Sequence, residues 1–126
     1  MSSIRVLLVD DEEELVVTIQ ERLEMRGIVT EAVTDGHEAL ERIQQSAFDV
    51  VVVDLKMPGL AGTDVVDVIE RRRPKTQVLF ITGHGAKPDE LKELADRGYR
   101  VLLKPFKIER LTAMIREVAP SAETDR

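Results

Sequence analysis

The chain has 126 residues and a formal net charge of −6, with 43% hydrophobic and 33% charged residues. These values are typical of one compact domain, and an acidic chain with 3% aromatic residues lacks the basic patch of a direct nucleic-acid binder. The absence of cysteine excludes disulfides and thiolate metal sites. No apolar stretch approaches the ~20 residues that cross a bilayer and none resembles a signal peptide, so we expect a cytoplasmic protein without membrane contact.

Five short apolar runs alternate with five segments of helical periodicity along the chain. The runs, which we expect to be strands, are residues 4–9, 28–32, 50–53, 78–81 and 101–103. They are rich in Val, Ile and Leu with little polar alternation, which is typical of parallel strands buried on both faces. Between them, apolar residues recur at helical spacing over 15–23, 39–43, 65–69, 91–95 and 111–118.

Helix-breaking residues support these boundaries. Gly27 follows the first helical segment, Pro74 follows the third, Pro88 begins the fourth and Gly98 lies just past its end. Strict alternation predicts an α/β fold in which helices cover both faces of a five-stranded parallel sheet. We take the strand order 2-1-3-4-5 from the doubly wound, flavodoxin-like class. The expected domain covers residues 1–120, and residues 121–126 form a polar tail.

Polar side chains follow the strands at the edge where ligands bind in such sheets. Asp10 and Asp11 follow the first strand, and Asp54 follows four valines at the end of the third. Thr82 follows the fourth strand and Lys104 the fifth. If the first and third strands are neighbours, three carboxylates meet at one edge, where like charges resist joint ionisation. Such a cluster indicates a site for a divalent cation and for chemistry on one acid.

These residue types match the requirements of phosphoryl transfer. Carboxylates hold Mg2+, and a carboxylate can act as the nucleophile that forms an aspartyl phosphate. A lysine and a hydroxyl stabilise the charge on a phosphoryl group. A structural interpretation also exists, because Asp10 or Asp11 could cap a helix that begins with Glu12, Glu13 and Glu14.

The chain resembles the receiver domain of two-component response regulators. The resemblance rests on four stretches and extends over residues 4–118. The stretches are Val9-Asp10-Asp11, Val53-Asp54-Leu55-Lys56-Met57-Pro58-Gly59, Ile81-Thr82-Gly83 and Lys104-Pro105-Phe106.

The resemblance implies that Asp54 is the phosphoacceptor, which receives its phosphoryl group from the phosphohistidine of a sensor histidine kinase or histidine phosphotransfer protein. It implies that Asp11 binds Mg2+ directly and that Asp10 helps, mainly through water. Asp54 and the backbone carbonyl of Lys56 would complete the protein ligands of the metal.

The resemblance also assigns the remaining site residues. The Thr82 hydroxyl would contact the phosphoryl oxygen, and Lys104 would pair first with Asp54 and then with the phosphoryl group. The Lys104-Pro105 bond is expected to be cis. The phosphorylated domain would change its affinity for a downstream protein through the fourth helix, fifth strand and fifth helix, a face that could also form a homodimer.

Two features of the sequence concern how phosphorylation would switch the domain. Val101 stands where the family usually has its switch aromatic, and Tyr99 lies two residues too early. We therefore expect activation to move the loops after Asp54 and Thr82 without an aromatic ring rotating inward. Lys56 and His84, each two residues beyond a site residue, are hypothesised to tune the lifetime of the phosphorylated state.

Two other functions remain open from the sequence. An aspartyl-phosphate phosphatase would usually carry its nucleophile on the first strand with a second Asp two residues later, where this chain has Glu12. An interaction module that is never phosphorylated is the other alternative. The preferred interpretation is a phosphoacceptor that assists its own phosphorylation and dephosphorylation and is not a turnover enzyme.

Overall fold

The computed structural model describes residues 3–57, 62–83 and 85–120. The motif residues Pro58 and Gly59, the position of His84 and the tail 121–126 lie outside the described residues. In chain order the elements are β1 (Arg5–Val9), α1 (Glu13–Glu24), β2 (Val29–Val33), α2 (Gly36–Gln45), β3 (Val50–Asp54), α3 (Gly62–Arg72), β4 (Gln77–Thr82), α4 (Pro88–Asp96), β5 (Arg100–Leu103) and α5 (Ile108–Val118).

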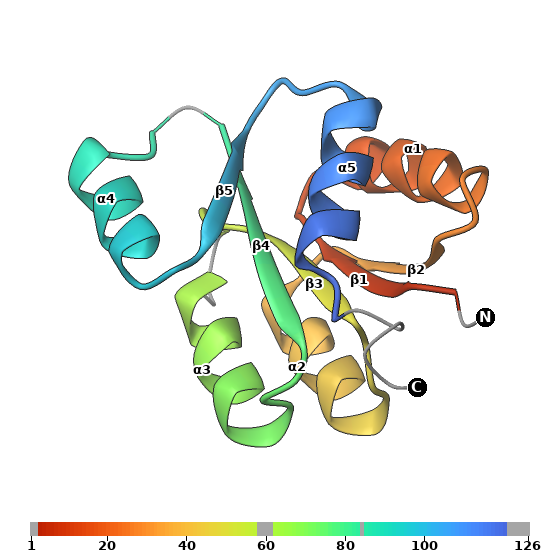
Figure 1. The fold of residues 1–126 in the computed structure, drawn as a ribbon, viewed down its shortest axis with the longest axis horizontal. Coiled ribbons are helices and arrows are strands. Elements are labelled where there is room, and N and C mark those ends of the chain that lie inside the picture. The colour runs from red at the N-terminus through yellow and green to blue at the C-terminus, as the bar shows by residue number, and fades with distance from the viewer. Residues whose placement is uncertain (1–2, 58–61, 84, 121–126) are drawn as a thin grey trace.

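The five strands form one parallel sheet in the order β2-β1-β3-β4-β5, which confirms the predicted topology. Helices α1 and α5 lie on one face of this sheet, and α2, α3 and α4 lie on the other (Figure 1). None of the helices in the described part of the chain has the length and apolarity that spanning a bilayer requires.

The sheet is buried on both faces, which explains why its strand sequences do not alternate. In β1, Leu7 and Val9 face the core under α2, α3 and α4, whereas Val6 and Leu8 face the core under α1 and α5. The four valines of β3 divide in the same way, and all are fully buried. The edge strands β2 and β5 are partly exposed.

Local chemistry sets the helix ends largely as the sequence indicates. Asp35 caps α2 by accepting hydrogen bonds from the amides of His37 and Glu38, at 2.6 and 3.1 Å. Gly27 lies three residues after the end of α1 and Gly98 two residues after the end of α4, with φ values of 81° and 89°, a region that glycine enters without steric cost. The chain therefore turns back toward the sheet after each of these helices.

Strands β2, β3 and β4 end one residue beyond the predicted runs, and the last two of these extensions matter for the site. Asp54 and Thr82 are the last residues of β3 and β4 and not the first loop residues. Both belong to the strand ladders, since Asp54 pairs with Ile81 and Thr82 pairs with Leu103. The next residues are also tied to the sheet, because the Leu55 amide donates to the Ile81 carbonyl at 2.9 Å and the Lys104 amide donates to the Thr82 carbonyl at 2.7 Å. The side chains of Asp54 and Thr82 are thus held by rigid backbone.

Candidate functional site

Strand register brings the acidic residues of the first and third strands together. Val9 pairs with Val53 in the β1–β3 ladder, so Asp10 and Asp54 occupy equivalent places at the carboxyl ends of neighbouring strands. The Asp10 amide donates to the Val33 carbonyl at 3.2 Å, which keeps the first residue after β1 close to the sheet. Of the three carboxylates that were predicted to meet, Asp10 and Asp54 lie together, whereas Asp11 is exposed and lies outside this group.

Lys104 reaches into this group from the end of β5. Its Nζ lies 2.7 Å from Oδ2 of Asp10, 2.8 Å from Oε1 of Glu12 and 3.2 Å from Oδ2 of Asp54. The lysine side chain is 15% exposed, so solvent screens these contacts only in part. One ammonium thus contacts three carboxylates, one from the last residue of β3 and two from the segment between β1 and α1.

Burial makes this arrangement electrostatically demanding. Asp10 is fully buried, and burial raises the pKa of its carboxyl group, an effect that the nearby Lys104 ammonium opposes and the charge of Asp54 increases. Burial alone would lower the pKa of Lys104, but its contacts with the Asp10 and Glu12 carboxylates raise that pKa overall. Lys104 is therefore charged, and in the described part of the chain it is the only cation paired with Asp10, Glu12 or Asp54.

The two oxygens of Asp54 have different partners. Oδ1 accepts a hydrogen bond from the Lys56 amide at 3.0 Å, and Oδ2 accepts one from Lys104 at 3.2 Å. The side chain is fixed at both oxygens while the residue is 5% exposed. A carboxylate held in this way is pre-oriented toward the edge of the sheet, as a nucleophile requires.

Thr82 is fully buried beside these groups. Among the residues that the structure describes, its hydroxyl has no hydrogen-bond partner. An unsatisfied buried hydroxyl normally costs free energy, so this one is suited to a partner that arrives from outside the chain. The peptide bond between Lys104 and Pro105, after the end of β5, is cis, which confirms the cis bond that the resemblance implies.

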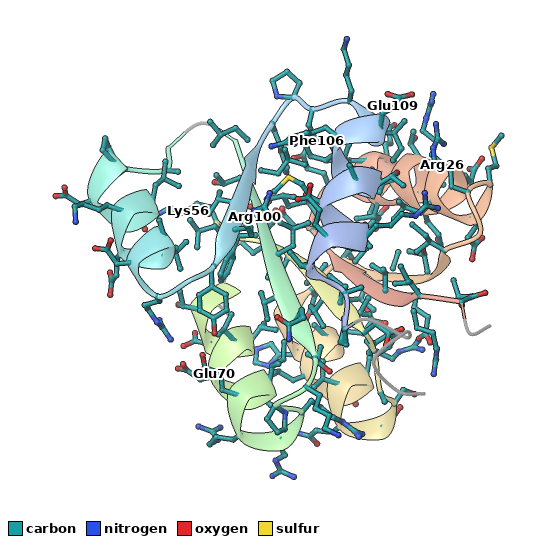
Figure 2. The ribbon with its side chains drawn as sticks, in the orientation of Figure 1. Arg26, Lys56, Glu70, Arg100, Phe106 and Glu109 are labelled. Atoms are coloured by element: carbon teal, nitrogen blue, oxygen red, sulfur yellow. The ribbon has the colours of Figure 1, made fainter. Side chains whose placement is uncertain are left out.

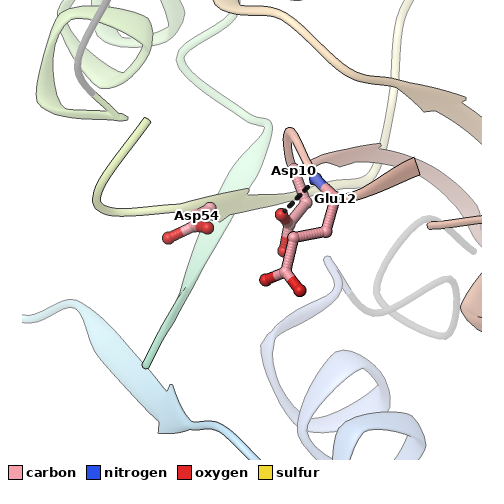
Figure 3. A group of neighbouring side chains, drawn as sticks. All are labelled: Asp10, Glu12 and Asp54. Atoms are coloured by element: carbon pink, nitrogen blue, oxygen red, sulfur yellow. Dashed lines mark hydrogen bonds between the residues drawn. The ribbon is translucent and has the colours of Figure 1, made fainter. Parts of the chain in front are cut away.

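The acidic group fits Mg2+. Ligand oxygens of Asp10, Glu12 and Asp54 lie within 4.8 Å of one another (Figure 3). Carboxylate oxygens are the ligands that this hard cation prefers, and it keeps several waters or phosphate oxygens as its remaining ligands. Asp11 is exposed and lines the adjoining pocket, so its assignment as a direct ligand, like that of the Lys56 carbonyl, stays a prediction.

Glu12 is the site residue that the sequence did not indicate. In the sequence Glu12 is one of three consecutive acids, which are typical of a helix N-terminus. Its partner Lys104 lies 92 residues away in sequence. Only the register of β5 against the sheet could have revealed that contact. The alternative that Asp10 or Asp11 caps α1 is wrong, because the N-cap residue is Glu12 and its side chain makes no cap hydrogen bond. Asp10 Oδ1 accepts a hydrogen bond from the Glu12 amide at 3.0 Å, just before the helix begins.

A pocket of about 870 Å3 opens beside the acidic group, between α1 and the segment that leads into α5. Asp54, Lys56, Gly83 and Lys104 lie among its lining residues. Its apolar lining residues are Leu15, Ile19, Pro105, Phe106 and Ile108. Phe106 lies in the segment just before α5 (Figure 2). A donor group of another molecule therefore has space to approach Asp54.

The comparison with protein families gives one match that covers most of the chain. Residues 6–116 match the family model of the response regulator receiver domain. Among individual proteins, the transcriptional regulatory protein TcrA of Mycobacterium tuberculosis is 31% identical over 119 residues, which are 94% of this chain and 47% of TcrA. The chain spans about half the length, or less, of the curated relatives that it matches.

Solved structures give the same fold. The beryllofluoride-activated receiver domain dimer of NtrC4 aligns with a TM-score of 0.83 at 34% identity, covering 91% of this chain and 95% of that one. The chemotaxis response regulator CheY4 of Vibrio cholerae aligns with a TM-score of 0.82 at 29% identity, covering 93% of this chain and 99% of that one.

Proposed function

The chain belongs to the response regulator receiver domain family of two-component systems, and from this premise we propose that it accepts a phosphoryl group on Asp54. The observation that carries the proposal is the group of contacts around that carboxylate. Asp54 is held at both oxygens, Lys104 links it to two further acids, and the buried Thr82 hydroxyl beside it lacks a partner within the described residues.

The chemical step is a transfer between two nucleophiles. An oxygen of Asp54 forms a bond to phosphorus while the phosphorus–nitrogen bond of a phosphohistidine breaks, and the imidazole nitrogen leaves with the bonding electron pair. Lys104 is positioned to exchange its contact with Asp54 for a contact with a phosphoryl oxygen. The Thr82 hydroxyl can donate to another, so the transferred charge is distributed over groups already present.

Asp10 and Asp54, with Asp11 or Glu12, are the side chains that would hold Mg2+, and the Lys56 carbonyl would add a backbone ligand. The bound ion would supply positive charge for the phosphoryl oxygens. The chain's own contribution is Lys104, whose ammonium contacts Asp10, Glu12 and Asp54. The family is a regulatory module, and we propose that this chain assists its own phosphorylation and dephosphorylation without turnover of a substrate.

The proposed partners follow from this function. The phosphodonor is a sensor histidine kinase or a histidine phosphotransfer protein, in the cytoplasm, and the output is altered binding of a downstream protein. The face of α4, β5 and α5 is proposed as the signalling surface and as a homodimer interface. Formation of a homodimer, though not the choice of this face, is supported by the similar NtrC4 receiver, which is a dimer. The functional unit is proposed to be residues 1–120.

The test is incubation of the purified protein with acetyl phosphate and Mg2+, followed by intact mass measurement. We expect the wild-type chain to gain one phosphoryl group, and Asp54→Asn to gain none. A metal-chelated sample serves as the control. Wild-type protein that never gains the mass, with acetyl phosphate or a panel of kinases, would instead favour the unphosphorylated interaction module. Continuous release of phosphate from an ester would favour the phosphatase.

A further inference from the structure

The loop after the phosphoacceptor is connected to the N-terminus of α4 by one side chain pair. Nζ of Lys56 lies 2.8 Å from Oε2 of Glu90, and Oε1 of the same carboxylate accepts a hydrogen bond from the Lys87 amide at 3.1 Å. Lys87 is the N-cap residue of α4. Glu90 therefore binds the loop with one oxygen and caps the helix with the other.

The same lysine is fixed to the phosphoacceptor through its backbone. The Lys56 amide donates to Oδ1 of Asp54 at 3.0 Å, and Lys56 lines the pocket that contains Asp54. Its ammonium lies on the α4 side of the sheet (Figure 2). A lysine two residues from the acceptor thus has two possible anionic partners, namely Glu90 and any phosphoryl group on Asp54.

We propose that Glu90 is a positioning residue that holds the Lys56 ammonium away from Asp54 in the resting state and releases it when the acceptor carries a phosphoryl group. This inference rests on the proposed function and goes beyond it, because it assigns to the pair the transmission of the charge change from the site to α4. When Lys56 leaves, Glu90 keeps only its hydrogen bond to the Lys87 amide, so the first turn of α4 has a changed set of contacts.

Charge favours this exchange. The side chains of Lys56 and Glu90 are 45% and 36% exposed, so their ion pair is solvent-screened and easily broken. A phosphoryl group carries more negative charge than a carboxylate and offers three acceptor oxygens. The Lys56 hydrogen bond lowers the pKa of Glu90, so the carboxylate stays charged and competes for the lysine at neutral pH.

The experiment uses beryllofluoride with Mg2+ as the probe, titrated into the full chain and followed by amide chemical shifts. Glu90→Gln removes the charge but retains an acceptor for the Lys87 amide, so α4 keeps its cap. We expect this variant to bind the probe about two- to five-fold more tightly, the range that corresponds to a partly exposed ion pair. In a Lys56→Met background, Glu90→Gln should leave the affinity unchanged.

Two further variants complete the design. Lys56→Arg keeps the positive charge and should preserve the effect of Glu90→Gln. Lys92→Met breaks the exposed Lys92–Asp96 pair on the same helix and should leave probe affinity unchanged. In wild-type protein the amides of Asp89, Glu90 and Leu91 should shift on probe binding, and in Lys56→Met these shifts should shrink by at least half.

The outcomes separate this inference from the proposed function. Affinity that is equal in wild type and Glu90→Gln, or an effect of Glu90→Gln that persists without Lys56, overturns the role of Glu90 while phosphorylation of Asp54 stands. Unchanged α4 shifts in Lys56→Met overturn the transmission to α4. Wild-type protein that gains no phosphoryl mass and shows no probe binding overturns the proposed function and, with it, this inference.

Discussion

Replacing Lys104 by methionine should destabilise the metal-free protein far more than the loss of an ordinary surface lysine. Methionine retains much of the apolar stem and removes the ammonium, so packing changes little. The substitution leaves Asp10, which is fully buried, and Asp54, which is 5% exposed, without their common cation. The consequence is a pair of adjacent buried carboxylates with no compensating charge.

The expected magnitude follows from burial. Removing one partner of a buried ion pair typically costs about 3–5 kcal/mol. Glu12 adds little, because its side chain is 61% exposed and such pairs contribute about 0–1 kcal/mol. Because the site opens to a pocket, we take the lower end and expect a loss of about 3 kcal/mol, a large part of the ~5–15 kcal/mol that stabilises a typical domain.

Urea unfolding in the presence of a chelator, and again with excess Mg2+, measures this effect. Metal bound only by the folded state at 100 times its dissociation constant adds about 2.7 kcal/mol, so Mg2+ should restore most of the lost stability. Lys92→Met on α4 is the control, with an expected loss of about 0.5 kcal/mol or less. A Lys104→Met protein that loses under ~1 kcal/mol without metal would contradict the view that this ammonium holds the acids together.

Three smaller predictions follow from other contacts. Thr82→Val removes a buried hydroxyl that has no partner in the described chain, so it should raise resting stability by about 1 kcal/mol in urea unfolding and weaken beryllofluoride binding in the titration. Tyr99→Phe deletes the hydrogen bond from the Tyr99 hydroxyl to Glu70 and should cost about 1 kcal/mol at pH 8. Burial and that hydrogen bond raise the pKa of Tyr99 to about 12 from 10.0. The contribution of the Tyr99 hydroxyl to folding stability is therefore complete below pH 10 and is lost as pH rises toward 12. Unfolding curves at pH 8 and 11.5 should show a smaller loss of stability at the higher pH for Tyr99→Phe than for the wild type. Gly98→Ala places a side chain at φ 89° and should lower stability by about 1 kcal/mol by the same assay.

The sheet could be predicted from sequence because burial on both faces leaves a strong pattern. The run Val50–Val53 requires a strand covered on both sides, and the structure divides those valines between two cores. Parallel strands then place Asp10, Asp54, Thr82 and Lys104 at one edge, whatever the details of the loops. The residues at the strand ends were therefore the most predictable part of the site.

Contacts between loops and helices could not be predicted in the same way. Glu12 and Glu90 each read as acids near a helix N-terminus, where a negative charge is favourable in isolation. Their partners, Lys104 and Lys56, lie 92 and 34 residues away in sequence. The spacing of residues in the sequence does not indicate these pairs. Glu12 and Glu90 are partly exposed, and many exposed acids have the same sequence pattern.

The position of Tyr99 bears on how this receiver could signal with valine at position 101. Tyr99 precedes β5, so it lies at the amino end of a strand whose carboxyl end carries Lys104, about 16 Å away at ~3.3 Å per residue. Its ring packs edge-on against Phe80 with centroids 5.6 Å apart, and its hydroxyl donates to Glu70 on α3. These contacts secure the ring at the far edge of the sheet, where a charge on Asp54 exerts little force. Lys56, in contrast, is bonded to Asp54 through its amide and to α4 through Glu90. In the mechanism that we propose, a change of charge at the acceptor acts on Lys56 and, through Glu90, on α4, without rotation of an aromatic ring.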